Sequence, residues 1–248
     1  GAGETPFGRS VSSLGSMAEE AAAGAMERAS LGDVDAVVLG SMTPMGTLGE
    51  AHVTSKVVDH LGLTPRPALR VEAGPATGAA ALHAGYWAVA SGQHETVLVM
   101  AAEKLSHLEP RDAAGVLARI ATPEERALGL TMPGMTALMA RAYMQRHGAT
   151  DEDLADLAVK AHRNALANPH AHRRRRLSRD EVMADRMVAE PLRRYNCAPL
   201  SDGAAAVVLT SRRAGPVRVS GIGAATDRLR YADRPVHERG HDRGVDAA

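Results

Sequence analysis

Cysteine is nearly absent from this sequence, and an excess of charge is absent altogether. The 248 residues include a single cysteine, Cys197, so no internal disulfide can form and a reducing compartment is the simplest expectation. Lys and Arg together number 29, as do Asp and Glu, so no overall field favours nucleic acid or an anionic membrane. No apolar run is long enough to span a membrane, and no secretory signal opens the chain. We therefore predict a cytoplasmic protein without nucleic-acid or membrane partners.

Aromatic residues are the second shortage. Phe, Trp and Tyr make up 2% of the sequence although apolar residues make up 45%, so Ala, Val, Leu and Met must fill the core. Small side chains permit a close approach of helices to a sheet. The length suits one large domain or two modest ones. Because the chain begins with Gly1 and residues 242–248 look like the start of a further element, we expect a fragment of a longer protein.

Strand and helix patterns alternate through the first 104 residues. Residues 34–40 and 68–73 are predicted strands, and residues 95–102 have the apolar composition of a strand buried on both faces. Capping boxes at Ser16–Glu19 and Thr47–Glu50 predict helices that end near Ala29 and Leu61, and a further helix is expected over residues 77–90. This alternation predicts an α/β fold with a largely parallel sheet.

The pattern changes after Lys104, because no run typical of a strand appears until residues 204–210. Three helices are predicted in between, over residues 135–146, 151–167 and 179–187, the last two behind the caps Thr150 and Ser178. We interpret this interval as a helical insertion.

The glycine turn between residues 73 and 77 is the best candidate for a site. A turn of this kind presents the unpaired N–H groups at the start of its helix to whatever binds above the sheet. A reactive group is therefore expected near Pro75, Ala76 and Thr77.

Several segments together resemble a known family. They are the turn and its flanks from Arg70 to Lys104, and residues 129–144, 158–164, 167–169 and 197–209. The first of these resembles the nucleophile turn of thiolases, Val-Glu-x-x-Cys-Ala-Ser-Gly followed by a helix and a Val-rich strand ending in Glu-Lys. The others resemble the loop domain and return strand of the branch that includes the thiolase domain of sterol carrier protein X. The resemblance covers nearly the whole chain.

This resemblance implies the N-terminal half of a thiolase, with an α/β core of the αβαβα type. It implies core residues 1–104, a helical loop domain over residues 105–194, and return strands over residues 195–248 that stop before the C-terminal half. The implied partners are that C-terminal half, with which this half packs, and a second subunit that pairs through the strand before the turn. A half without its partner would expose an apolar layer of helices.

The resemblance also implies a site for coenzyme A thioesters, with no covalently bound cofactor and no metal. The implied substrate-binding residues are Ala76, Thr77, Gly78, Met132, Pro133, Arg174 and Arg175. One of the arginines in the run 173–176 is expected to meet the nucleotide end of coenzyme A, because guanidinium groups suit phosphates. The nucleophile position, however, holds Pro75, which has no thiol, so no catalytic residue is assigned.

The resemblance leaves three functions open. In the first, the parent protein is an enzyme of acyl-CoA and lipid metabolism with altered chemistry. An example is the retro-aldol cleavage that some relatives lacking the cysteine perform with a small zinc-ribbon and OB-fold partner. Alternatively, it is a non-catalytic subunit that binds acyl-CoA or scaffolds an enzyme. The third is an ordinary acetyl-CoA C-acyltransferase. A histidine in a His-Asp-x-Phe motif, or a tyrosine facing the pocket, in the C-terminal half would favour catalysis.

Other motifs are weaker. The segment from Gly3 to Ser10 differs from a P-loop by Arg9 in place of lysine, and is interpreted as a glycine-rich loop. His237-Glu-Arg-Gly-His241 has zinc-site spacing, but the glycines disfavour a helix. His162, His170 and His172 lack an accompanying cysteine and are separated by Pro169, so His162 is expected to be a packed or hydrogen-bonded helix residue. Cys197 and the methionines 132, 135 and 139 are expected to be structural, although the methionines could line an acyl tunnel.

Overall fold

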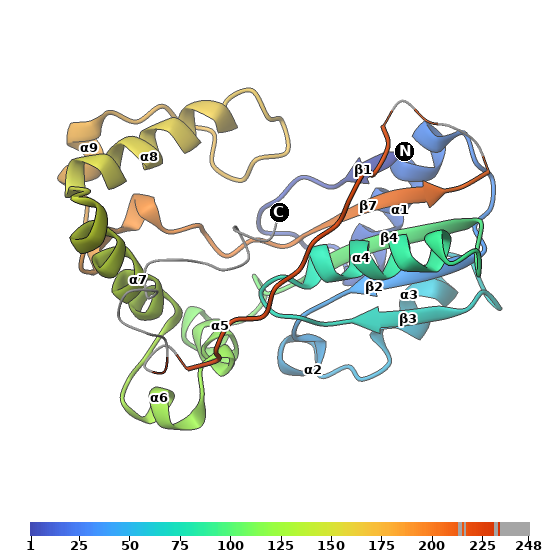
Figure 1. The fold of residues 1–248 in the computed structure, drawn as a ribbon, viewed down its shortest axis with the longest axis horizontal. Helices are drawn as coiled ribbons and strands as arrows, with labels where there is room; N and C mark the ends of the chain where they lie inside the picture. Colours follow the sequence, from blue (N-terminus) through green and yellow to red (C-terminus); the bar gives the residue numbers. More distant parts are fainter. Residues whose placement is uncertain (213–214, 216, 231–232, 234–248) are drawn as a thin grey trace. The chain divides into compact units, whose positions relative to one another are not determined.

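The computed structural model describes residues 1–212, 215, 217–230 and 233. The chain divides into two compact units, the first formed by residues 1–109 and 200–220 and the second by residues 110–199 and the segment from Gly221 onward. The two units are shown in Figure 1. Strands and helices alternate in the first unit and helices dominate the second, which confirms the predicted α/β fold.

A five-stranded sheet forms the centre of the first unit. Its strand order is β1-β7-β4-β2-β3. The strands are β1 (Ala2–Glu4), β2 (Ala36–Gly40), β3 (Ala68–Val71), β4 (Thr96–Glu103) and β7 (Gly203–Thr210). β2 is parallel to both β3 and β4, whereas β7 is antiparallel to β4 and to β1. β1, β2, β3 and β4 therefore run in one direction and are joined by helical connections, as the prediction of a largely parallel sheet requires, whereas β7 returns from the insertion in the opposite direction.

Helices cover both faces of this sheet (Figure 1). On one face α1 (Leu14–Ala29) and α3 (Val53–His60) pack on alternate residues of β2, β4 and β7 and form the larger apolar core. On the other face α4 (Thr77–Ala90) packs on a smaller cluster that includes Ala36, Val38, Val97 and Val99. β4 is buried on both sides as predicted, because it lies between these two cores.

Small residues bring α4 very close to the sheet. A Cβ atom placed on Gly40 of β2 would lie 3.2 Å from both the Thr77 carbonyl oxygen and Ala81 Cβ. A Cβ on Gly85 of α4 would lie 2.2 Å from Val99 Cγ2, closer than atoms can approach. The glycines are therefore required for the packing of this helix, as the shortage of large side chains predicts.

Two predicted helix starts are wrong. α1 begins at Leu14 because Ser13, not Ser16, is the N-cap and its Oγ accepts a hydrogen bond of 3.0 Å from the Ser16 N–H. Thr47 does not open a helix. A short helix, α2 (Pro44–Thr47), begins earlier at a proline, and Thr47 Oγ1 donates to the Thr43 carbonyl at 3.0 Å. The helix predicted to follow is α3, which starts at Val53.

Asp202 fastens two loops to the start of β7. Its side chain is fully buried and accepts hydrogen bonds from the backbone N–H groups of Leu105 and Ser106 (2.8 Å each) and of Ser10 (3.1 Å). The Ser106 hydroxyl donates to it at 2.5 Å, and Lys104 Nζ lies 3.4 Å away. Burial acts to raise the pKa of Asp202, but these hydrogen bonds outweigh burial and hold the pKa at about 2.

The second unit is mainly helical. Its elements are α5 (Pro110–Leu117), η1 (Ala118–Ile120), α6 (Pro123–Ala127), α7 (Met132–His147), α8 (Asp151–Ala165), α9 (Arg179–Met183), β5 (Met187–Ala189), β6 (Leu192–Arg193) and η2 (Arg194–Asn196). The three predicted helices correspond to α7, α8 and α9, and the caps Thr150 and Ser178 are confirmed. The prediction of a helix over residues 179–187 is too long, because α9 ends at Met183 and Met187 begins β5. The β5–β6 hairpin was not predicted, because strands of three and two residues leave no apolar run.

A small core holds α8, α9 and η2 together. It consists of Ala155, Ala158, Leu177 and Val182, with Tyr195 packed against it. In addition, Asn196 Nδ2 donates to the Leu154 carbonyl at 2.9 Å, which fixes η2 on α8. Within the described residues, no helix combines the length and the apolar character needed to cross a membrane.

Candidate functional site: the α4 turn and the arginine pocket

The turn before α4 has the geometry that the sequence predicts. β3 ends at Val71 and α4 begins at Thr77, whose side chain is buried. Thr77 Oγ1 accepts a hydrogen bond of 3.2 Å from the Ala73 N–H, and Gly74 N–H donates to Glu72 Oε1 at 3.0 Å. Ala76 is the N-cap and contributes no side-chain cap. Ala76, Thr77 and Gly78 thus bring backbone groups to the helix start, and Pro75 adds no nucleophile.

Several polar groups lie near this turn, at the carboxyl ends of β2, β3 and β4. This is the edge at which α/β sheets commonly bind ligands. Glu103 follows Val97, Val99 and Ala101 at intervals of two, so its side chain lies on the α4 face of β4. It accepts a short hydrogen bond from the Met42 N–H. Met42 would in turn lie 2.6 Å from a Cβ placed on Gly74, so Met42 connects Glu103 with the turn.

Glu103 has an unusual environment for a carboxyl group. Burial raises its pKa above the ordinary value and the charge of Glu72 adds to this, although the Met42 N–H and Arg70 act in the opposite direction. Its Oε2 atom is buried without a hydrogen-bond partner, as is the Oγ of the neighbouring Ser41. Glu103 is the glutamate of the Glu-Lys pair that ends the Val-rich strand, and the sequence alone assigned it no role. A charged residue at the end of an apolar strand was the signal that could have identified it as a site residue.

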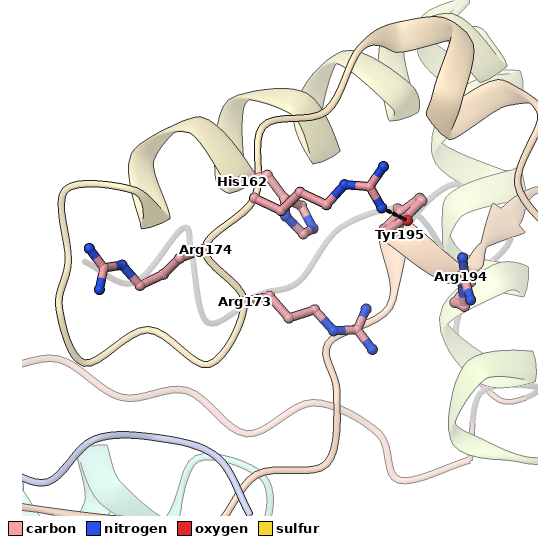
Figure 2. A pocket seen from close by; sticks show the side chains of 6 residues that line it. His162, Arg173, Arg174, Arg194 and Tyr195 are labelled. Carbon is pink, nitrogen blue, oxygen red and sulfur yellow. Dashed lines mark hydrogen bonds between the residues drawn. The ribbon is translucent and has the colours of Figure 1, made fainter.

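The second unit contains an open hollow of about 370 Å³ lined by His162, Arg173, Arg174, Arg175, Arg194 and Tyr195. The side chains are shown in Figure 2. His162 comes from α8, the three consecutive arginines from the loop after it, and Arg194 and Tyr195 from η2. We call this group the arginine pocket. Its guanidinium groups could hold an anion, and phosphate is the anion that they suit best.

The predicted site residues are distributed unevenly over these features. Arg174 and Arg175 both line the arginine pocket, but Figure 2 shows Arg174 directed away from Tyr195 and Arg194. Met132 and Pro133 begin α7 in the same unit, are partly buried, and do not line the pocket. His162, Arg194 and Tyr195 were not predicted as site residues. No sequence motif links these three residues to the arginine run, and they lie beside it only because of the fold.

The remaining candidates give no reactive group. Cys197 is half-buried, and burial raises the pKa of its thiol, the opposite of what an activated thiol requires. In the part of the chain that the structure describes, no three His, Cys, Asp or Glu residues are grouped as metal ligands. The pair His237 and His241 lies outside the described residues.

Solved structures with a similar fold include two of human mitochondrial 3-ketoacyl-CoA thiolase, one of them in complex with CoA. They superpose with TM-scores of 0.65 and 0.66 at 16% identity, and the match with the CoA complex covers 85% of this chain and 63% of that one. A further structure, "Ltp2-ChsH2(DUF35) aldolase", reaches a TM-score of 0.68 at 28% identity and covers 85% of this chain and 55% of that chain. The fold is therefore that of thiolases.

Comparison of the sequence leads to the family itself. Residues 1–213 match the family described as "Thiolase, N-terminal domain". An acetyl-CoA acetyltransferase of Methanothermobacter thermautotrophicus is 40% identical over 213 residues, which are 84% of this chain and 55% of the relative. Rabbit sterol carrier protein 2 is 30% identical over 176 residues, 66% of this chain and 31% of the relative. The chain belongs to the thiolase family, as its motifs indicated, and spans about half the length of the acetyltransferases that it matches.

Proposed function

We propose that this chain is the coenzyme A-binding N-terminal half of a thiolase-family protein that acts on acyl-CoA thioesters without forming an acyl-enzyme. The observation that carries the proposal is Pro75 at the position where the family has its cysteine, directly before the first turn of α4. Proline offers neither a thiol nor an N–H, so covalent acyl transfer cannot pass through this turn.

The arginine pocket is the proposed site for the nucleotide end of coenzyme A. Arg174 and Arg175, with Arg173, supply guanidinium groups for its phosphates, and the first turn of α4, at Ala76, Thr77 and Gly78, is proposed for the thioester end. Met132 and Pro133 stay proposed as contacts of the acyl or pantetheine part. One relative is an acetyl-CoA acetyltransferase and one structural neighbour is a thiolase in complex with CoA, which supports coenzyme A as the ligand.

For the chemistry we propose retro-aldol cleavage by the longer protein. In that reaction a base removes the proton of a β-hydroxyl group, the Cα–Cβ bond breaks to leave a carbonyl product, and an acid returns a proton to the Cα of the thioester. No covalent enzyme intermediate is needed, so Pro75 is compatible with it. The neighbour named as an aldolase favours this reaction, and its name, which joins two proteins, favours a small partner protein.

A non-catalytic role is the second candidate. Pro75 supplies no nucleophile at the α4 turn, which favours a subunit that binds acyl-CoA or scaffolds an enzyme. One experiment, in which the full-length protein is incubated with a 3-hydroxyacyl-CoA, distinguishes the two candidate functions. Release of the carbonyl product supports the aldolase, whereas saturable binding without product supports the scaffold.

The experiment that tests the shared proposal uses the chain as it exists. Titration calorimetry with coenzyme A should show saturable binding, and the intact mass after incubation with acetyl-CoA should stay unchanged. The Pro75→Cys variant should also stay unmodified, because the family's other catalytic residues belong to the C-terminal half. Absence of coenzyme A binding, or an acetyl group on either chain, contradicts the proposal.

We also propose a homodimer that forms through β3. Within the described sheet β3 is an edge strand that pairs only with β2, and its Leu69 is 50% exposed. Such an edge can pair with a second copy. Light scattering should show a dimer for the chain and a monomer for Leu69→Lys. A monomeric unmodified chain contradicts this interface.

Finally, we propose that a C-terminal thiolase half covers the outer face of α4. This helix is apolar all round although only Thr77, Ala81 and Gly85 are buried, and Trp87 is 59% exposed. Trp87 is the only tryptophan in the chain, so its fluorescence reports on this face alone. Co-expression with the C-terminal half should shift the emission to the blue, and an unchanged emission in an isolated complex contradicts the proposal.

A further inference from the structure

The charges of the arginine pocket are only partly balanced. Arg175 pairs with Glu181 at 2.6 Å and Arg194 pairs with Asp185 at 3.0 Å. For Arg173 and Arg174 the described residues provide no carboxylate within ion-pair distance, and Arg174 makes only a hydrogen bond of 3.3 Å to the Leu166 carbonyl. The pocket therefore carries about two positive charges that no described carboxylate offsets, which suits an anion with two negative charges.

Tyr195 holds the wall of this pocket in a fixed arrangement. Its hydroxyl accepts a hydrogen bond of 2.9 Å from Arg175, which Figure 2 shows as a dashed line, and the Arg194 guanidinium lies 5.0 Å from its ring centre. His162 meets the same ring edge to face, with centroids 5.7 Å apart and planes at 90°. The imidazole is therefore held against Tyr195 beside the arginines, and little reorganisation would be needed for it to meet a ligand.

His162 is the one residue of this wall whose charge can change near neutral pH. Its ring packs against Tyr195, as expected for a packed helix residue, while its Nδ1 atom is buried without a hydrogen-bond partner. Burial lowers the pKa of His162, and the charges of Arg173 and Arg175 lower it further, while a contact with the Arg175 backbone acts in the opposite direction. Arg194 and Tyr195 face it from η2, and Glu181 and Asp185 are engaged by the arginines. Without a bound anion, burial and the neighbouring guanidinium groups therefore favour the neutral form of the imidazole.

We infer that His162 gives the arginine pocket a preference for a phosphate monoester over a phosphodiester. A monoester carries close to two negative charges above its second pKa of about 6, whereas a diester carries one. A dianion beside Arg173 and Arg175 reverses the field at His162, so the imidazole takes up a proton from solvent and donates a charge-assisted hydrogen bond. This rests on the proposed function, in which the ligand is coenzyme A. Its 3′-phosphate is the monoester, and dephospho-coenzyme A lacks it.

Calorimetry of the whole chain with coenzyme A and dephospho-coenzyme A at pH 6.5 and 8.5 tests the inference. At pH 6.5 coenzyme A should bind about tenfold more tightly than dephospho-coenzyme A, which corresponds to one pKa unit of linkage. This preference for coenzyme A should shrink at pH 8.5. Titrations in two buffers of different ionisation enthalpy should show proton uptake with coenzyme A only. In His162→Gln the preference should become independent of pH and the proton uptake should vanish. His52→Gln, which changes an exposed histidine of the other unit, should behave as the unmodified chain.

A second measurement uses the unmodified chain and therefore does not depend on whether a variant folds. The ring signals of His162 are titrated by NMR in the unmodified chain with adenosine 3′-monophosphate or, as a diester control, dimethyl phosphate. The monoester should raise the midpoint of the His162 titration, and the diester should not. Equal binding of both coenzyme forms at pH 6.5 overturns the inference and leaves the proposed function standing. If neither form binds, the proposed function fails, and an unmoved His162 midpoint with the monoester then overturns the inference as well.

Discussion

Around α4 the helix packs closely on the sheet through small residues, whereas around the arginine pocket long charged side chains hold one another in place. The first arrangement depends on residues that have almost no side chain, such as Gly40 and Gly85. The second depends on the exposed guanidinium groups of Arg175 and Arg194, which pair with the Tyr195 hydroxyl and with the buried carboxylate of Asp185. The difference teaches that the α4 region should tolerate substitution poorly but respond little to salt, while the pocket should tolerate substitution well and respond strongly to salt and pH.

The largest effect should come from adding one methyl group to α4. Gly85→Ala places a Cβ atom against Val99 where no space exists, and we expect a loss of about 3 kcal/mol in the free energy of unfolding. Gly115→Ala in α5 is the matched control, since nothing lies within 4 Å of its new Cβ and alanine favours a helix. Urea denaturation measures both. Equal stability of the two variants would remove the contrast between tight and open packing.

Asp202 offers the next largest effect, because its carboxylate organises two loops of the first unit. Its folded pKa of about 2 lies below the ordinary 3.8, so its stabilisation is present above pH 3.8 and is lost as the pH falls through 2. The shift corresponds to about 2 kcal/mol. Asp202→Asn should lose this amount at pH 7 and should depend less on pH between 4 and 2. Asp59→Asn, at an exposed position, serves as the control, and an equal loss there would contradict the assignment.

A single arginine of the pocket should have a moderate effect, and on binding alone. Arg173→Gln removes a guanidinium group that no described carboxylate offsets, so coenzyme A should bind about tenfold more weakly, or about 1.4 kcal/mol. The difference should narrow in high salt. Arg163→Gln on α8 removes the same charge outside the pocket lining. If both variants weaken binding equally, only the overall charge matters and the pocket is not the site.

The smallest effect is expected at Glu103, the charged residue of the tightly packed region. Because burial raises its folded pKa, its stabilisation is present at low pH and is lost as the pH rises through the folded pKa. Glu103→Gln keeps an acceptor for the Met42 N–H and cannot ionise, so it should cost less than about 1 kcal/mol and should remove this pH dependence. Glu103→Ala should cost more. A Gln variant as unstable as the Ala variant would contradict the account.

The sequence was most informative where apolar periodicity and capping decide the structure. The bounds of α4 and the burial of β4 followed from the alternation of small apolar residues with glycine breaks. The caps Thr150 and Ser178 were predicted as residues that commonly precede a helix, and in the structure each forms reciprocal hydrogen bonds with the residue three positions on. Thr47 misled because Pro44 starts a helix sooner, and the β5–β6 hairpin was missed because its strands are too short to show a pattern.

The candidate site could likewise be predicted only in part. The α4 turn could be predicted, because its residues are consecutive and its glycine break is visible. In the arginine pocket only the arginine run could be predicted, since His162 and Tyr195 are 33 positions apart and meet only through the packing of η2 on α8. Glu103 was missed as a distinct group because its environment depends on Ser41, Met42 and Glu72, which come from other strand ends.

One measurement tests the central claim, that this half binds coenzyme A thioesters but cannot be acylated. The chain is titrated calorimetrically with acetyl-CoA, and the same sample is then analysed by intact mass spectrometry. The account predicts saturable binding and an unchanged mass. A mass increase equal to an acetyl group on any residue, or no binding of acetyl-CoA, would contradict it.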